Sequence, residues 1–331
     1  MTQPWCPPPD RVLDLVIDTD VTNEVDDQFA LVWALLRPDR LNLVGLHACP
    51  YGLSPDLLLP GRGLLTELDR RKVERDLAAI GLTSEDIPVL PPSFGVERAY
   101  EDLVRLTGIA GVDVPVVAGA GSYLPDEATP VDSPAARALI ALAHAPREGR
   151  LHVAAIGCLT NVASALLLDP AITQRLVVVW TAAYPSFWPY ENASYNLAQD
   201  VAAARVVLAS GVPLVYVPGY YVGEELRVSG PELEAHVAGV GALGDYLWDA
   251  VRTHPLFKLD RVGASKVIWD LAPIAWLLDQ QWCTSRSVPT PDLDDELRWR
   301  PAPGRPEMVE VHDLDRDAVF ADLFARLASA R

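Results

Sequence analysis

The chain has 331 residues, a formal net charge of −18, and hydrophobic side chains at half of its positions. This length fits one large α/β domain or two smaller ones, with enough apolar residues for a sizeable core. The acidic charge argues against a nucleic-acid partner and against an anionic membrane surface, because both require a basic protein surface. It places no limit on a small neutral ligand.

The N-terminus and the cysteines bear on the location of the protein. Residues 1–10 are rich in proline and carry neither a basic region nor a long apolar stretch, so we expect a loose tail rather than a signal peptide. No stretch approaches the ~18 apolar residues of a membrane span. The four cysteines are scattered without zinc-ligand spacing, which is typical of a reduced, cytoplasmic protein. Cys158 is a candidate nucleophile, but a small buried residue after a strand is the favoured interpretation.

The first element predicted along the chain is a strand–loop–helix unit at residues 12–36. An apolar run at residues 12–17 precedes the segment DTDVTNEVDD at residues 18–27, and a helix-like apolar run follows at residues 29–36. Carboxylates this close repel one another and raise each other's pKa unless a cation lies among them. The segment therefore indicates a hard divalent cation held by oxygen ligands. The alternative is a solvated acidic loop that caps a helix.

The rest of the chain alternates between strand-like and helix-like segments. Further buried strands are expected at residues 41–47, 114–119, 151–157, 175–180 and 213–217. Helices are expected at residues 64–80, 94–106, 134–145, 162–168, 197–210, 271–278 and 317–327, and a hairpin at 297–299 and 308–311. This alternation predicts an α/β fold, a mostly parallel open sheet with helices on both faces and a Rossmann-like core.

The domain organisation follows from the same pattern. We find no internal repeat and no clear linker, so residues 1–331 are expected to form a single domain. Within it, residues 48–110 do not follow the alternation, and a loop rich in proline and glycine there (residues 50–63) predicts a lid or insertion.

Polar residues recur just after successive strands. In parallel topology these positions meet along one edge of the sheet, where α/β proteins bind their ligands. The residues are Asp18, Asp20, Asp26, Asp27, Thr160, Asn161, Asn196 and Asp270. Taken singly, Thr160 and Asn161 are an ordinary turn and helix cap, Asn196 is a loop amide, and Asp270 is an N-cap.

A family resemblance appears in these motifs. Residues 18–27 with the helix that follows resemble the signature of the nucleoside hydrolases, inosine/uridine-preferring type. The segment AIGCLTNVA (155–163), the segment YNLAQDVAAA (195–204) and the segment IWDLAPIA (268–275) are similar to later motifs of that family, in family order. Together the matches reach from residue 12 to about residue 280.

The resemblance implies a calcium-dependent hydrolysis of the N-glycosidic bond of a ribonucleoside or related N-riboside. Ca²⁺ would be bound by Asp20, Asp27, the backbone carbonyl of Thr160 and Asp270, with Asp20 also acting as general base on a water. Asp26 would hold sugar hydroxyls and Asn196 would contact the sugar, while Asp18 and Asn161 would support the site. The expected partner is a small nucleoside-like substrate, and family members are commonly homo-oligomers.

The sequence also departs from the family pattern. The spacing between the two aspartate pairs is longer, because residues 21–25 replace a shorter Pro-Gly turn. The family often has a histidine before the last aspartate as leaving-group acid, where this chain has Trp269. The family usually has an acidic residue two positions before the sugar-binding asparagine. This chain has Ser194 at that position, and Glu191 and Asn192 lie nearby as candidate substitutes. The sugar and base contacts are therefore expected to differ from those of the family.

Two alternatives remain open at this point. Residues 18–22 also fit the DxDxT motif of haloacid-dehalogenase-like phosphatases, with Asp18 as nucleophile, although the later motifs would then be unexplained. A protein that binds a metal and a ribosyl group without turnover would explain the altered contacts. A weaker prediction concerns aromatic residues after the fifth strand, which either stack on the leaving group or pack at a subunit contact: Trp180, Tyr184, Phe187, Trp188, Tyr190 and Tyr195.

Overall fold

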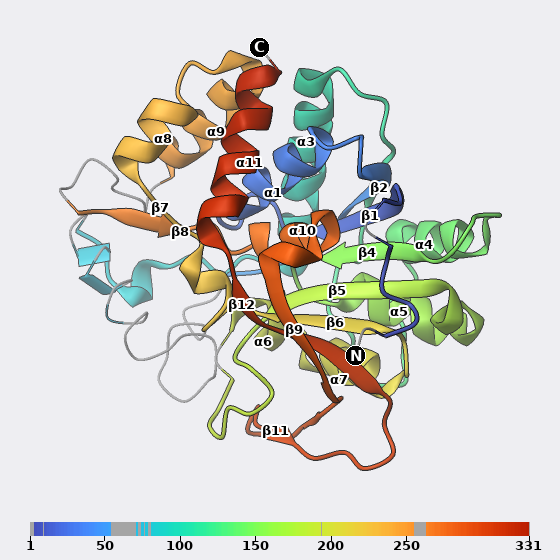
Figure 1. The fold of residues 1–331 in the computed structure, drawn as a ribbon. Coiled ribbons are helices and arrows are strands. Elements are labelled where there is room, and N and C mark those ends of the chain that lie inside the picture. The colour runs from blue at the N-terminus through green and yellow to red at the C-terminus, as the bar shows by residue number, and fades with distance from the viewer. Residues whose placement is uncertain are drawn as a thin grey trace.

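The protein is built on one large sheet (Figure 1). The structure, a computed structural model, describes residues 3–8, 10–53, 71, 74–75, 77–78, 81–192, 194–254 and 263–330. The sheet has eight strands, in the spatial order β3 (Val116–Ala118), β2 (Leu41–Ala48), β1 (Leu13–Thr19), β4 (Leu151–Ala155), β5 (Leu176–Ala182), β6 (Leu214–Pro218), β12 (Glu307–Leu314) and β9 (Cys283–Pro289). All neighbouring pairs are parallel except β12 and β9, which are antiparallel.

Helices cover both faces of this sheet. The α-helices are α1 (Asp26–Leu35), α3 (Pro92–Ala110), α4 (Pro134–His144), α5 (Thr160–Leu168), α6 (Tyr195–Ala198), α7 (Val201–Ala209), α8 (Gly230–His236), α9 (Gly241–Thr253), α10 (Leu271–Leu278) and α11 (Arg316–Ser329). Short 3-10 turns occur at Ser84–Asp86, Pro170–Arg175, Gly223–Glu225 and Gln280–Trp282. Two small antiparallel ribbons pair β7 (Arg227–Ser229) with β8 (Ser265–Val267), and β10 (Asp292–Leu293) with β11 (Trp299–Arg300).

The core is divided by the sheet into two layers. One apolar cluster joins the sheet to α1, α3, α8, α9, α10 and α11, and the other joins it to α4, α5 and α7. The same two groups of helices lie on opposite sides of the sheet in Figure 1. Strands β4 and β5 are buried along their whole length, as expected when helices cover both faces of a parallel sheet. The predicted fold class is confirmed.

The connections reverse the strand order at the middle of the sheet. From β1 the chain moves outward to β2 and β3, and it then returns to β4 on the other side of β1 before continuing to β5 and β6. Strand order therefore reverses between β1 and β4. In open α/β sheets the loops diverge at such a point, and the carboxyl ends of the two strands form a ligand site.

Two predicted elements differ from the structure. The helix expected over residues 197–210 is two helices, α6 and α7, because the Asp200 side chain accepts a hydrogen bond from the backbone N–H of Ala203 and starts a new helix. The predicted hairpin at 297–299 and 308–311 is wrong. The first segment pairs with β10 instead, and the second is part of β12, whose apolar residues fit between β6 and β9 in the main sheet.

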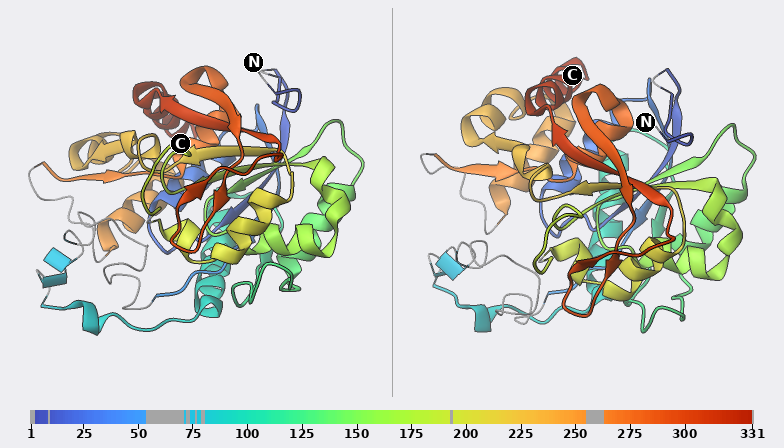
Figure 2. Two further views of the ribbon diagram at one scale, coloured as in Figure 1. Left: turned by 90° about the horizontal axis from the view of Figure 1, so that it is seen from below. Right: turned by 60° about the horizontal axis from the view of Figure 1, so that its bottom comes forward.

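The β10–β11 ribbon extends one side of the molecule beyond the main sheet (Figure 2). It lies beside α7, where the guanidinium of Arg205 donates to the backbone carbonyl of Leu293 at 2.9 Å. The ribbon also contacts the segment before α6, because Asn192 in that segment donates hydrogen bonds to the carbonyl of Leu297.

Two further expectations concern the N-terminal half. The tail is anchored where it is described, since the Gln3 amide donates to the Ser287 hydroxyl at 2.7 Å and Trp5 packs against the core. The loop predicted at residues 50–63 and the helix predicted at 64–80 lie largely outside the described residues. The lid and the single domain stay predictions.

Candidate functional site

Three buried carboxylates meet at the carboxyl edge of the sheet. Asp26 and Asp27 form the first turn of α1, and Asp270 occupies the N-cap position of α10. One carboxylate oxygen from each lies within 4.8 Å of the other two, and all three side chains are buried. Helices α1 and α10 pack against each other, so the long sequence separation between residues 27 and 270 is closed by the core.

The position of Asp270 excludes its ordinary structural role. An N-cap aspartate normally accepts a hydrogen bond from a backbone N–H in the first helical turn. Asp270 makes no such bond, and its carboxylate faces Asp26 and Asp27 instead. Burial, and then the charges of Asp26 and Asp27, hold the pKa of Asp270 well above its usual range.

Asp20 lies near this group but is not one of the three carboxylates that approach one another within 4.8 Å. It is 3% exposed and follows β1 directly, and its charge contributes to the raised pKa values of Asp27 and Asp270. Burial is the largest cause of the raised pKa of Asp20 itself, followed by Cys158 and Asp26. A Cβ added at Gly157 would lie 2.9 Å from Asp20 Oδ1, so the glycine after β4 lets the two strand ends approach.

These carboxylates fit a hard cation. Repulsion among buried acids is relieved by protonation or by a positive ion, and oxygen-only ligands favour calcium or magnesium over zinc. Asp26 Oδ1 is a buried atom with no hydrogen-bond partner among the described residues. Burial raises the pKa of Asp26 to about 7, although the nearby ammonium of Lys266 opposes the shift.

A second polar network lies behind the acids. The Asn161 amide donates to Asp18 Oδ1 at 2.8 Å, and its oxygen accepts the Ala120 backbone N–H at 2.9 Å, so it joins the ends of β1 and β3 to α5. Burial raises the pKa of Asp18 to about 7, partly offset by Asn161. The Thr160 hydroxyl donates to Asp200 at 2.6 Å, which holds the first turn of α5 against α7.

The next predicted residues lie in α6 and in the segment before it, which form a wall of the candidate site beside the carboxyl ends of β4 and β5. Asn196 lies in α6, and its amide donates to the carbonyls of Ile156 at 2.8 Å and Thr181 at 3.1 Å, at the ends of those strands. Ser194 is buried immediately before α6, and Glu191 is half-buried.

Asn192 anchors this segment to the β10–β11 ribbon. Its amide and its backbone N–H both donate to the carbonyl of Leu297, at 2.8 and 2.9 Å. Its Oδ1 is buried and has no hydrogen-bond partner among the described residues, so the expected substrate contact stays a prediction.

The aromatic residues divide into two sets. Trp180 is fully buried and donates its indole N–H to the Gly157 carbonyl at 3.3 Å, so it is a core residue. Tyr195 donates its hydroxyl to the Gly52 carbonyl at 2.7 Å. The other predicted aromatic residues belong to a series of ring contacts that starts beside the acids: Tyr184, Phe187, Trp188 and Tyr190. Trp269 contacts Tyr220 with ring centroids 5.5 Å apart, Tyr220 stacks on Tyr184 at 4.4 Å, and Tyr184 stacks on Trp188 at 4.5 Å.

Several residues near the acids had no recognisable signal in the sequence. Lys266 is 7% exposed, and its ammonium donates to Glu24 at 2.5 Å. Tyr51 and Tyr123 lie close enough to Asp20 for its charge to raise their pKa values, after the larger effect of burial. A lysine inside a strand pattern and tyrosines in loops are common, so only the folded arrangement identifies them.

Cys158 is confirmed as a buried residue after a strand. Its thiol contacts the Pro50 carbonyl at 3.1 Å and the Thr160 hydroxyl at 3.3 Å. In the part of the chain that the structure describes, the four cysteines are free.

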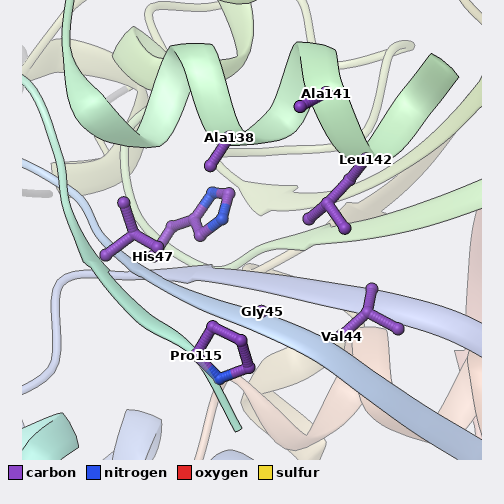
Figure 3. A pocket seen from close by; sticks show the side chains of 8 residues that line it. Val44, Gly45, His47, Pro115, Ala138, Ala141 and Leu142 are labelled. Carbon is purple, nitrogen blue, oxygen red and sulfur yellow. The ribbon is translucent and has the colours of Figure 1, made fainter. Parts of the chain in front are cut away.

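A pocket of about 300 Å³ lies on the other side of β2, under α4 (Figure 3). It is lined by apolar side chains such as Val44, Pro115 and Leu142, with the imidazole of His47 directed toward α4. Burial lowers the pKa of His47 to about 4. None of the predicted site residues lines this pocket, so it is separate from the acidic group.

Among the described residues, no helix is long and apolar enough to cross a membrane.

Comparison with known proteins gives one consistent family. A sequence model described as inosine-uridine preferring nucleoside hydrolase matches residues 68–319. A putative pyrimidine-specific ribonucleoside hydrolase RihB from Shigella boydii serotype 4 (strain Sb227) is 36% identical over 72 residues. That match covers 21% of this chain and only 30% of the Shigella protein.

Solved structures share the fold over nearly the whole chain. A plant nucleoside hydrolase, the PpNRh1 enzyme, superposes with a TM-score of 0.68 at 18% identity, covering 97% of this chain and 100% of that one. A purine-preferring ribonucleoside hydrolase from Gardnerella vaginalis gives a TM-score of 0.67 at 18% identity, with coverages of 96% and 98%. At this identity the likeness shows the fold alone.

Proposed function

The chain belongs to the inosine-uridine preferring nucleoside hydrolase family, and from that premise we propose that it hydrolyses the N-glycosidic bond of a ribonucleoside or related N-riboside with the help of bound Ca²⁺. The observation that carries the proposal is the meeting of Asp26, Asp27 and Asp270 within 4.8 Å, where the Asp270 carboxylate makes no helix-capping hydrogen bond. The substrate is a small molecule, since the acidic surface suits neither nucleic acid nor an anionic membrane.

Asp20, Asp27 and Asp270, with the backbone carbonyl of Thr160, would hold the cation. Their donor set is oxygen only, and the buried like charges favour a divalent ion over a neutral ligand. A cation bound there would supply the means to lower the pKa of a water toward neutrality. The Thr19 hydroxyl, which donates to Asp27 Oδ1 at 2.5 Å, fixes one carboxylate of the set.

The chain's own residues would then carry the hydrolysis. Asp20 would accept a proton from the attacking water, and the water oxygen would form a bond to the anomeric carbon as the bond to the base nitrogen breaks. Asp26 offers an unpartnered buried oxygen, Oδ1, for sugar hydroxyls. The surrounding carboxylates would stabilise the positive charge that develops on the sugar. Asp18 and Asn161 support this edge from behind.

The wall beyond β5 would contact the sugar and the leaving group. Asn196 is held with its amide on two strand ends, so its side-chain oxygen is the group left for the sugar. We assign Ser194, Glu191 and Trp269 to the same wall, with Asn192 anchoring it. Trp269 can stack on a base but cannot protonate it, so departure of the base would depend on stacking and on sugar activation.

The two alternatives make different demands on the site. A phosphatase would need Asp18 as an exposed nucleophile, but Asp18 is 1% exposed and accepts a hydrogen bond from Asn161. A binding protein without turnover would keep the same metal ligands, so only an assay separates it from a hydrolase.

The test is release of free ribose. Purified protein is incubated with purine and pyrimidine ribonucleosides in a reducing-sugar assay, with added Ca²⁺ or with a calcium chelator, and Asp270→Ala serves as the inactive control. We expect ribose release from at least one nucleoside, abolished by the chelator and in the variant. No release from any nucleoside, with calcium demonstrably bound, would favour the binding protein.

A homo-oligomer in the cytoplasm is also part of the proposal. Phe187, Tyr190 and Tyr221 are exposed aromatic residues at the outer end of the ring series, and they suit a contact between subunits. Light scattering of the purified protein would measure the assembly.

A further inference from the structure

The loop between β1 and α1 contacts three separate parts of the site. Its residues 21–25 are where the sequence is longer than expected for the family. Thr22, Asn23 and Glu24 each direct a side chain to a different partner: Tyr51 after β2, Asp20 at the end of β1, and Lys266 on β8. These contacts do not follow from the family pattern, because that pattern has a shorter turn here.

Asn23 holds one oxygen of the proposed general base. Its amide donates to Asp20 Oδ2 at 3.2 Å, and its backbone N–H donates to the Asp20 carbonyl at 3.0 Å. The other oxygen, Oδ1, lies toward Gly157 at the end of β4. A carboxylate tied at one oxygen keeps its second oxygen in a defined direction, whereas an untied one rotates. Among the described residues, Asn23 is the side chain that donates to the Asp20 carboxylate.

The turn itself is strained, and its strain has a visible compensation. The bond from Asn23 N–H to the Asp20 carbonyl closes a four-residue turn, and Thr22, at its third position, has φ +83°. Glycine or asparagine is usual there, because a β-branched residue at positive φ is unfavourable. The Thr22 hydroxyl makes a 2.7 Å contact with the Tyr51 hydroxyl. The turn therefore combines an unfavourable backbone conformation at Thr22 with a side-chain contact within the site.

Glu24 and Lys266 connect the loop to the opposite side. The Lys266 side chain is 8% exposed, and its ammonium donates to Glu24 at 2.5 Å and to the Val267 carbonyl at 2.8 Å. Lys266 is the buried partner of this pair, whereas the Glu24 side chain is 43% exposed, and the ammonium also lies near the charges of Asp26 and Asp270. We therefore expect the pair to fix geometry more than to add stability. Lys266 stands four residues before Asp270, so this pair links the segment of one proposed metal ligand to the loop that follows another.

We propose that Asn23 is a positioning residue that orients Asp20 for proton abstraction, and that the Glu24–Lys266 ion pair is the strut that fixes the β1–α1 loop across the site. The inference rests on the proposed function, because it assigns Asp20 the role of base. The proposal gives the extra residues of this loop two roles. Asn23 sets the direction of the Asp20 carboxylate, and Glu24 sets the distance between the β1–α1 loop and β8.

The first test replaces Asn23. Asn23→Ala removes the donor, and Asn23→Asp keeps the size but places a second carboxylate against Asp20. We expect kcat to fall about tenfold in Asn23→Ala and further in Asn23→Asp, with KM within about twofold of wild type, since a hydrogen bond to a charged group is worth roughly this much. Calcium affinity of Asn23→Ala, by calorimetry, should stay within about threefold, because no metal ligand is removed.

The matched control is Asn42→Ala. The Asn42 amide also donates to an aspartate, Asp14, at 2.7 Å, but both lie at the opposite end of their strands. This variant should keep wild-type kcat. Unchanged kcat in both Asn23 variants would overturn the positioning role. So would a loss of calcium binding in Asn23→Ala, because Asn23 would then support the metal site rather than the base.

The second test is a double-mutant cycle on the strut. Lys266→Met and Glu24→Gln should each raise KM several-fold, and the double variant should be no worse than the more damaged single variant, because each group acts through the other. Additive effects would overturn the strut. Calcium affinity gives an independent readout: it should rise several-fold in Lys266→Met and fall in Glu24→Gln, since one change removes a positive charge and the other a negative one.

The two proposals fail in different ways. If wild-type protein releases no ribose from any nucleoside, the proposed function fails, while a double-mutant cycle on calcium affinity still decides the strut, because additive changes in the Lys266 and Glu24 variants would overturn it. If wild type is active and the Asn23 variants match it, the function stands and the positioning role falls.

Discussion

Two aspartates occupy the N-cap positions of two different helices, but only one of them accepts a capping hydrogen bond. Asp200, at the N-cap of α7, accepts hydrogen bonds from the Ala203 backbone N–H at 2.9 Å, the Leu124 backbone N–H at 2.9 Å and the Thr160 hydroxyl at 2.6 Å. Asp270, at the N-cap of α10, caps nothing and faces two other carboxylates. Both are 3% exposed, so burial does not distinguish them.

The difference lies in what satisfies each charge. Burial raises the pKa of Asp200, but its three donors counteract the shift, whereas the neighbours of Asp270 add to its shift. A buried carboxylate with protein donors is satisfied by the scaffold, whereas one that faces other carboxylates must be relieved by a proton or by a positive ion. The comparison therefore distinguishes the satisfied acid from the candidate metal ligand by their surroundings alone.

The largest effect is expected from loss of two of the proposed metal ligands. Asp270→Ala and Asp20→Ala should each lose bound calcium, by elemental analysis, and lower ribose release by about three orders of magnitude or more. Without metal, each variant should have a melting temperature equal to or above that of metal-free wild type, because the substitution removes repulsion among the buried carboxylates. Full turnover with normal calcium content in either variant would show that the ligand assignment is wrong.

Loss of the satisfied aspartate should affect folding instead. Asp200→Ala leaves three donors without their acceptor, and we expect the free energy of unfolding in urea to fall by about 3 kcal/mol. Calcium affinity at a temperature where the variant is folded should remain close to wild type. A variant of normal stability that has lost calcium would reverse the comparison.

The pH dependence of stability should depend on calcium. Asp18 and Asp26 have pKa values of about 7 in the folded protein, above the ordinary value of 3.8. The folded state then binds more protons than the unfolded state between these values, so the stability that these two groups contribute is fully present below about pH 4 and is lost as the pH rises through about 7. Thermal melts of the metal-free protein should fall by several degrees from pH 5 to pH 8.

Saturating calcium should flatten that curve. The ion stabilises the ionised acids around it, so its stabilising effect should be larger at pH 8 than at pH 5. An equal calcium effect at both pH values would mean that protons and the ion do not compete for these groups.

The smallest effect is expected at Asp18, which lies between the two classes. It has one donor, Asn161, while its Oδ2 has no partner among the described residues. Because burial raises the pKa of Asp18 to about 7, the protonated form that Asn resembles is well populated at neutral pH, and Asp18→Asn should change the free energy of unfolding by less than about 1 kcal/mol. Calcium affinity should fall by less than tenfold. A larger loss of calcium would place Asp18 among the ion's ligands.

The sequence by itself determined the layers of the fold and the place where the candidate site is expected. Buried runs such as residues 12–17 and 151–157 alternate with amphipathic segments, and this periodicity predicts strand and helix because each must bury one face or both. The acidic segment after the first buried strand identified its place, since strand ends in a parallel sheet share one edge. The prediction of a hairpin at residues 297–299 and 308–311 was wrong because the sequence of β12 fits a hairpin strand and a strand inside the main sheet equally well.

Only the tertiary structure decided which polar groups work together. Asp200 and Asp270 look alike in sequence, and their different roles come from what the packing of α7 and α10 brings near them. The same holds for Asn192, whose donors are taken by Leu297, and for Lys266, which reaches Glu24 from 242 residues away. Local pattern records whether a residue is buried, but the partners of a buried charge come from distant segments that only the folded core brings together.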